Sequence, residues 1–239
     1  MQASIAPRGI KIPGDPSLLS TQQQFDQSIA ATIRHEDPDL SGRVIDDNSR
    51  AILGGSVDAW EIVDKDPKLI HHLMTNVLKV KDAAKGSAFI NYFKAKDLDE
   101  HLGHTKKGKL TTTQKARRKL LELTPDQTKA LVTWAYKHNL EVLTNSHGFI
   151  SKEVLENNPS LHQLLGDMAY RHGGSFMTSS RQGYRGIADA LKHALYPTEK
   201  YSRDTAIAKM DRLLFGQGTY GKKNKKISNR YHFLKDRFQ

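Results

Sequence analysis

Among the dipeptides that join a residue able to cap a helix to a proline, four begin predicted helices. They are Asp15-Pro16, Asp66-Pro67, Thr124-Pro125 and Asn158-Pro159. A capping side chain accepts a hydrogen bond from a first-turn amide, and proline is well tolerated at the first helical position. The signal is strongest at Thr124, because Gln127 follows it by three residues, which is the spacing of a capping box. Each pair predicts a helix start, so the chain is constrained to a largely helical fold.

Apolar residues at helical spacing follow these starts. A helix is predicted from Pro16 to Arg34, and Leu161, Leu164 and Leu165 begin a core-facing stripe in the helix that Gly173-Gly174 ends. In the helix that starts at Thr124, we expect Leu131, Trp134 and Ala135 to lie in the core. The remaining predicted helices begin at Asp66, before Ile187 and at Ser202.

Two segments have weaker signals. From His35 to Asp64, turn residues alternate with short apolar runs, which predicts loops with one short strand. From Leu140 to Ile150, a small hairpin and a packed loop both remain open.

The helical signals extend over nearly the whole chain without a linker that would divide it. We therefore predict a mainly α fold: a single irregular multi-helix domain over residues 17–216. Prolines and glycines make residues 1–16 a flexible N-terminal arm, and residues 217–239 form a basic, partly docked C-terminal tail. The 239 residues suffice to bury a core, and 37% of them are hydrophobic.

Several classes of protein are excluded by composition. Cysteine is absent, which rules out disulfides, thiolate metal sites and a cysteine nucleophile. No secretory signal and no run of about 18 apolar residues is present, so we expect a soluble protein without a membrane span. The expected location is cytoplasmic or virion-associated, and export would need a non-classical route.

The net charge of +11 is concentrated in two segments of the chain. Thr105–Leu120 carries +7 and Gln217–Gln239 carries +6, so the other 200 residues sum to −2. Such clustering favours a polyanionic partner, whereas a solvated flexible segment is the alternative interpretation. The predicted binding residues are Lys106, Lys107, Lys109, Lys115, Arg117, Arg118 and Lys119 in the first segment, and Lys222, Lys223, Lys225, Lys226 and Arg230 in the second, which also contains Lys235 and Arg237.

The first basic segment predicts a helix of its own. Thr113 is the candidate cap, with Ala116 and Leu120 facing inward and the cations Lys115 to Lys119 facing solvent. Cations on adjacent turns can follow a phosphate backbone. A helix-turn-helix reader fits poorly, because only about one residue, Leu123, separates this helix from the next.

A second anion site is suggested by the polar loop Ser175 to Arg185. Its serines, Arg181 and Arg185 precede a helix whose N-terminal amides favour a phosphate. An exposed loop of small polar residues is the alternative.

Three further patterns give no site. Gly216, Gly218 and Gly221 have the spacing of the phosphate loop of protein kinases, yet only 18 residues follow, too few for the rest of that machinery. His101-x-x-His104 lacks the other ligands of a zinc site. No nucleophile elbow or paired carboxylates mark a catalytic centre, so we expect no enzyme activity, no metal and no cofactor.

The sequence thus predicts a non-enzymatic nucleic-acid-binding protein, an RNA-binding or DNA-binding basic protein of a packaging or nucleocapsid-like kind. RNA or single-stranded DNA is favoured over sequence-specific duplex DNA, because tail aromatics such as Tyr231 and Phe233 could stack on bases. The alternative is a secreted bacterial or viral effector that binds a host protein, with residues 1–30 as a delivery segment. A hydrolase or transferase with an unrecognised site is the third hypothesis.

Overall fold

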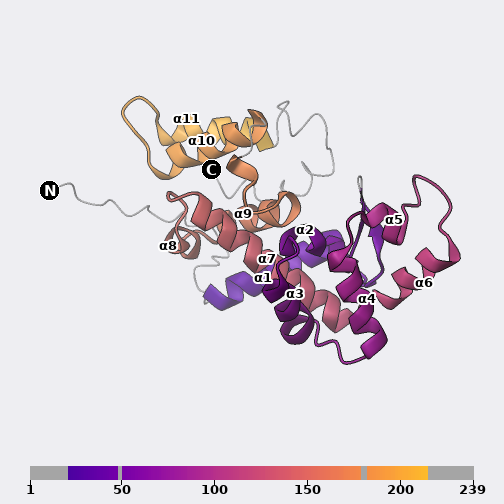
Figure 1. Cartoon of the computed structure of the whole chain (residues 1–239). Coiled ribbons are helices and arrows are strands. Elements are labelled where there is room, and N and C mark those ends of the chain that lie inside the picture. The colour runs from indigo at the N-terminus through magenta and orange to yellow at the C-terminus, as the bar shows by residue number, and fades with distance from the viewer. Residues whose placement is uncertain (1–20, 48–49, 179–181, 215–239) are drawn as a thin grey trace. The chain divides into compact units, whose positions relative to one another are not determined.

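Helices make up most of the protein in the computed structural model, which describes residues 21–47, 50–178 and 182–214 (Figure 1). The mainly α prediction is therefore confirmed. The helices are α1 (Thr21–Glu36), α2 (Ala59–Val63), α3 (Pro67–His72), α4 (Ala83–Lys94), α5 (Leu98–Leu102), α6 (Thr112–Leu120), α7 (Pro125–Ser146), α8 (Lys152–Glu156), α9 (Pro159–His172), α10 (Gln182–Leu195) and α11 (Arg203–Leu214). Shorter helical turns are a π-helix at Leu73–Val77 and 3₁₀ turns at Gly54–Ser56 and Phe176–Thr178.

The helix starts predicted at Asp66, Thr124, Asn158 and Ser202 are found in the structure. Thr124 and Gln127 form a reciprocal capping box at α7: the Gln127 amide donates to Thr124 Oγ1 at 3.2 Å and the Thr124 amide to Gln127 Oε1 at 3.1 Å. Asp66 caps α3 through the Lys68 amide at 2.8 Å. At α9 the proline starts the helix without a side-chain cap, because Asn158 donates to Val154 O instead.

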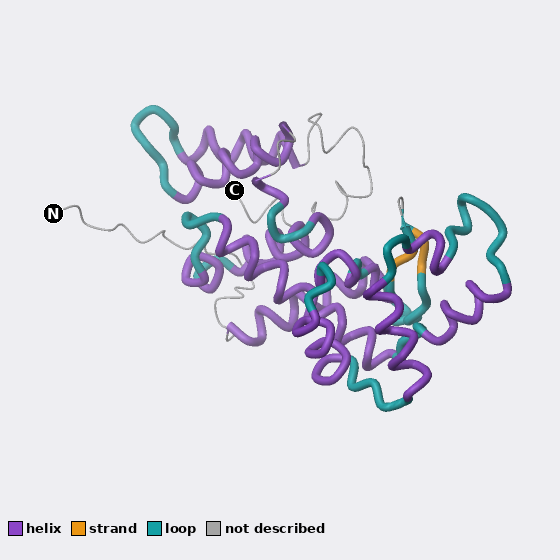
Figure 2. Tube along the Cα trace, viewed as in Figure 1, coloured by secondary structure: helices purple, strands orange, loops and turns teal. Residues whose placement is uncertain are grey.

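A two-stranded antiparallel ribbon lies in the segment where one short strand was predicted. Strand β1 (Ile45–Asp46) pairs with β2 (Ala51–Ile52), with Ile45 opposite Ile52 (Figure 2). Residues Ala51 and Ile52 are buried, whereas Ile45 is exposed. The ribbon therefore buries both residues of β2, whereas β1 exposes Ile45 and keeps the side chain of Asp46 covered.

Contacts along the chain group the residues into two compact units. Among the described residues, unit 1 comprises 21–28, 136–178 and 182–214, and unit 2 comprises 29–47 and 50–135. Helices α10 and α11 pack against each other in unit 1, and α6 packs against α4 and α5 in unit 2.

Three backbone segments of unit 2 meet at a pair of glycines. The Leu123 amide donates to Gly42 O at 2.9 Å. A Cβ on Gly42 would lie 2.0 Å from Leu123 O, and a Cβ on Gly54 would lie 2.6 Å from Gly42 Cα. Gly42 also has a φ of +63°, which side chains disfavour. Glycine is thus required here by both space and conformation.

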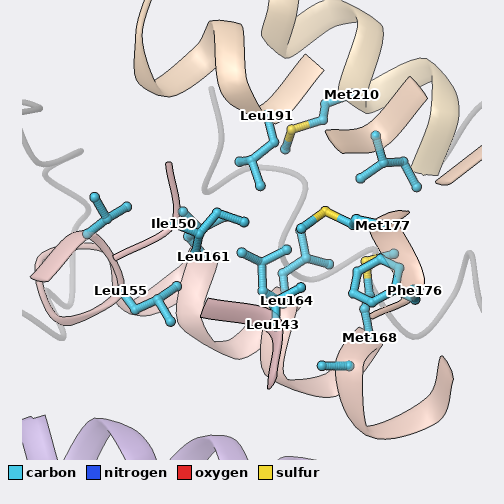
Figure 3. Packing of buried hydrophobic residues seen from close by; sticks show 14 of the residues in the cluster. Leu143, Ile150, Leu155, Leu161, Leu164, Met168, Phe176, Met177, Leu191 and Met210 are labelled. Atoms are coloured by element: carbon cyan, nitrogen blue, oxygen red, sulfur yellow. The ribbon is translucent and has the colours of Figure 1, made fainter. Parts of the chain in front are cut away.

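The core of unit 1 is formed by apolar side chains from α7 to α11 (Figure 3). Leu143, Leu164 and Met168 are fully or almost fully buried in it, and Leu191 and Met210 join it from α10 and α11. Leu143 belongs to α7, which continues to Ser146. Both open interpretations of 140–150, a hairpin and a packed loop, are therefore wrong over its first seven residues, because burial of Leu143 favours a longer helix.

Candidate nucleic-acid interface

Helix α6 carries most of the charge of the first basic segment. It begins two residues earlier than predicted, because Thr111, not Thr113, is its cap. The Gln114 amide donates to Thr111 Oγ1 at 3.2 Å, and the Thr111 amide donates to Gln114 Oε1 at 2.9 Å. Gln114 of this capping box is turned toward α5, because its side-chain amide also donates to Glu100 O at 3.3 Å.

Arg118 lies on the inner face of α6, where a solvent-facing cation was predicted. Its guanidinium donates to Asp46 Oδ1 at 2.5 Å and to the carbonyl oxygens of Leu102 and Gly103 at 2.9 and 2.6 Å. The side chains of Arg118 and Asp46 are 12% and 8% exposed. Arg118 thus joins β1 to the C-terminal end of α5, where unpaired carbonyls favour a cation.

Arg117 is also engaged by α5. Its Nη1 donates to His101 O at 3.0 Å, and the residue is half-buried. The two arginines and Gln114 therefore form the inner face of α6, and no residue of this helix is fully buried.

The outer face of α6 differs in part from the predicted one. Ala116 and Leu120, expected inside, are exposed, and Leu120 is 42% accessible. Lys115 and Lys119 are exposed beside them, as predicted. The outer face consequently combines two lysines with a small apolar strip.

Four lysines at this site have no side-chain hydrogen bond or ion pair within the described part of the chain. They are Lys106 and Lys109 in the loop between α5 and α6 (Figure 2), and Lys115 and Lys119 on α6; we call them the lysine group. All four are exposed. Lys107 differs, because its ammonium pairs with the carboxylate of Asp99.

The neighbouring elements add to the positive charge. Residues 79–119 hold twelve Lys and Arg against four Asp and Glu. Lys94 and Lys96, at and after the end of α4, are exposed. Because α4 packs against α6, these lysines belong to the same part of unit 2. The prediction from sequence omitted them, since they stand outside the densest run of cations.

The other predicted site residues fall elsewhere. Arg185 is exposed in the first turn of α10, a helix that begins at Gln182, inside the segment predicted to be a loop. Arg181 and the tail cations Lys222, Lys223, Lys225, Lys226 and Arg230 lie outside the described residues, as do the flexible arm and the kinase-like glycine spacing.

The histidines considered for metal binding have other surroundings. His104 is buried, with Nε2 2.9 Å from Asp47 O. For His101, burial and the nearby charge of Arg117 lower the pKa. Over the described ranges, no group of three or more His, Asp or Glu side chains could hold a metal ion.

The fold and the lysine group together describe a mainly helical protein that has a lysine-rich surface on one of its two units. No described helix has the length and apolar character needed to cross a membrane. Comparison with protein-family models, with curated proteins and with solved structures finds no match to this chain. Functional inference therefore depends on the residues themselves.

The pair between Asp46 and Arg118 predicts loss of stability in acid. Burial opposes ionisation of Asp46, but hydrogen bonds from Arg118 and Thr105 outweigh it and lower the pKa of Asp46 to about 2. A carboxyl group whose pKa is lower in the folded state stabilises above its unfolded pKa of about 3.9, and that stabilisation is lost as the pH falls toward 2.

We expect the free energy of unfolding to fall between about pH 5 and pH 2, and to fall less steeply in Asp46→Asn, which cannot titrate there. Urea unfolding at a series of pH values measures this. Equal slopes in the two proteins would show that Asp46 does not carry the acid sensitivity.

Proposed function

We propose that the chain binds the phosphate backbone of a nucleic acid through the lysine group. The supporting observation is that the arginines and lysines around α6 differ in their contacts. The two arginines of α6 donate to groups within unit 2, whereas the four lysines are exposed and have no partner among the described residues. Unpaired ammonium groups on a loop and the following helix can contact successive phosphates and release counterions.

The arrangement favours backbone contact over base reading. Arginine reads guanine through two parallel hydrogen bonds, a geometry that lysine does not offer. Arg117 and Arg118, the arginines of this helix, already donate to backbone carbonyls and Asp46. The proposed partner is accordingly a nucleic acid bound without strong sequence preference, with RNA or single-stranded DNA as the favoured class.

A packaging or nucleocapsid-like role, cytoplasmic or virion-associated, forms the finer part of this proposal. It agrees with sequence-independent binding by a basic helical protein, and it is an analogy of architecture. The effector alternative depends on residues 1–30, of which residues 1–20 lie outside the described part of the chain.

Replacing the four lysines of the group by glutamine is expected to weaken binding of a single-stranded oligonucleotide. Each lost phosphate contact should reduce the slope of log K against log salt by about 0.7 for a single strand. Fluorescence anisotropy over a salt series from about 50 mM measures both the affinity and the slope.

The matched control changes four other exposed lysines to glutamine: Lys68, Lys129, Lys192 and Lys200. It removes the same charge, so it separates a local contact from the effect of net charge. The proposal fails if the two variants lose equal affinity and slope, or if the wild type does not bind at low salt.

A further inference from the structure

A pocket of about 760 Å³ lies in unit 1, separate from the lysine group. Its walls come from α1, α7, α8 and α9. Helix α7 contributes Lys137, Leu140, Glu141 and Thr144, which share one face of the helix. The volume falls within the range of about 300 to 1,000 Å³ that is usual for small-molecule sites.

The apolar wall of the pocket is formed by Phe25, Leu140 and Leu155. His162 stacks on Phe25, with ring centroids 5.7 Å apart and planes inclined by 25°. Tyr136 supports both rings from behind, because it contacts each of them edge to face. This wall suits the apolar body of a ligand.

His162 is a buried polar side chain that offers the pocket a hydrogen bond. It is 6% exposed and lines the pocket, and its main-chain oxygen accepts a hydrogen bond from the Tyr136 hydroxyl at 3.3 Å. Burial lowers the pKa of His162 to about 4, only partly opposed by the charge of Glu156, so the imidazole is neutral near pH 7.

The remaining polar groups of the pocket present mainly acceptors. Gln22 uses its amide nitrogen on Asp26, at 2.8 Å, which leaves the amide oxygen. Thr144 donates its hydroxyl proton to Glu141 O, at 2.9 Å, which leaves the oxygen lone pairs. The carboxylate of Glu141 is exposed and lines the pocket, and its negative charge also acts on His138, where it opposes the burial that lowers the pKa of that imidazole. A ligand that donates hydrogen bonds complements all three groups.

Two lysines, Lys137 and Lys152, also line the pocket, and each has a partner there. Lys137 places its Nζ 5.0 Å from the centroid of the Phe25 ring, which is a cation–π contact. The ammonium of Lys152 is 3.5 Å from Glu156, and this side chain is 88% exposed. The position of Lys137 shows that an ammonium group is accommodated against Phe25.

We propose that this pocket binds an organic amine, a primary ammonium group attached to an apolar body. The ammonium group donates to Glu141 and to the oxygens of Gln22 and Thr144, and the apolar body contacts Phe25, Leu140 and Leu155. The neutral His162 adds one hydrogen bond. The inference is independent of nucleic-acid binding, since no residue of the lysine group takes part.

Three compounds with the same ring test the charge preference on the full chain: phenethylamine, 2-phenylethanol and phenylacetate. NMR titration of backbone amides is expected to show phenethylamine binding most tightly, with shifts centred on Glu141, Thr144 and Leu155. Glu141→Gln should weaken phenethylamine binding at least about tenfold, because a charge-assisted hydrogen bond is lost. Glu141 is exposed, so this variant should fold normally.

Two further variants test the inference, one expected to strengthen binding and the other to leave it unchanged. Lys137→Gln should strengthen phenethylamine binding, since it removes a like charge and frees the face of Phe25. Glu153→Gln, on the exposed side of α8, should leave binding unchanged. The proposal is overturned if phenylacetate binds as tightly as the amine, if Glu141→Gln has no effect, or if no compound binds at millimolar concentration.

Discussion

Replacing Arg118 by methionine is expected to destabilise unit 2 by about 3 to 5 kcal/mol, the usual cost of removing one partner from a buried ion pair. The change leaves the carboxylate of Asp46 buried without its cation and the carbonyl oxygens of Leu102 and Gly103 without a donor. The 12% and 8% exposure of the two side chains means that water cannot readily replace the lost contacts.

Tryptophan fluorescence during urea unfolding measures this effect directly. The chain has two tryptophans, Trp60 and Trp134, and both belong to unit 2. Lys119→Met is the control, because it removes a neighbouring charge from the exposed face and should change stability by no more than about 0.5 kcal/mol. Equal stability of the two variants would contradict the structural role assigned to Arg118.

The second large effect is expected at Gly42. Gly42→Ala should destabilise unit 2 by about 3 kcal/mol or more, because a backbone overlap adds to an unfavourable φ. The new Cβ would lie 2.0 Å from the carbonyl oxygen of Leu123, and the backbone there is fixed by the hydrogen bond from the Leu123 amide to Gly42 O. Movement that relieved the overlap would break that bond.

Gly86→Ala gives the matched comparison, with an effect of opposite sign. Gly86 lies inside α4 in the same unit, and its added Cβ would meet only Met74 Cε, at 4.0 Å. Alanine in a helix interior is favoured over glycine by about 0.5 to 1 kcal/mol, so this variant should be slightly more stable. The same fluorescence assay compares both variants. Destabilisation by Gly86→Ala, or tolerance of Gly42→Ala, would contradict the local geometry.

Helix starts were predictable from sequence because the capping interactions are local. Thr124 and Gln127 are three residues apart, and Asp66 and Lys68 two, so the sequence contains both partners side by side. The length of α7 was not predictable in this way. Its last turns are stabilised by burial of Leu143 among residues of α8 to α11, which are distant in sequence.

The orientation of α6 was predicted wrongly for a related reason. Its apolar residues, Ala116 and Leu120, indicated an inner face by pattern alone. The inner face is instead set by Arg118 and its partner Asp46, 72 residues earlier in the chain. Periodicity identifies the faces of a helix but not the polar contacts that compete for them.

The pocket in unit 1 lacked any sequence signal. Its residues come from four helices that are distant in sequence, and no motif joins them. His162 carried no motif, and only its burial against Phe25 marks it in the structure.

At α6 the exposed lysines contribute to the surface charge, whereas Arg118 makes the contacts that hold the helix in place. Acylation of Lys115 or Lys119, which are exposed, would remove positive charge without reaching the contacts that hold the helix. Substitutions at these lysines should not affect folding. Replacing Arg118 even by lysine would lose the simultaneous hydrogen bonds to Asp46, Leu102 O and Gly103 O. The surface charge of unit 2 can therefore be adjusted while its structure stays the same.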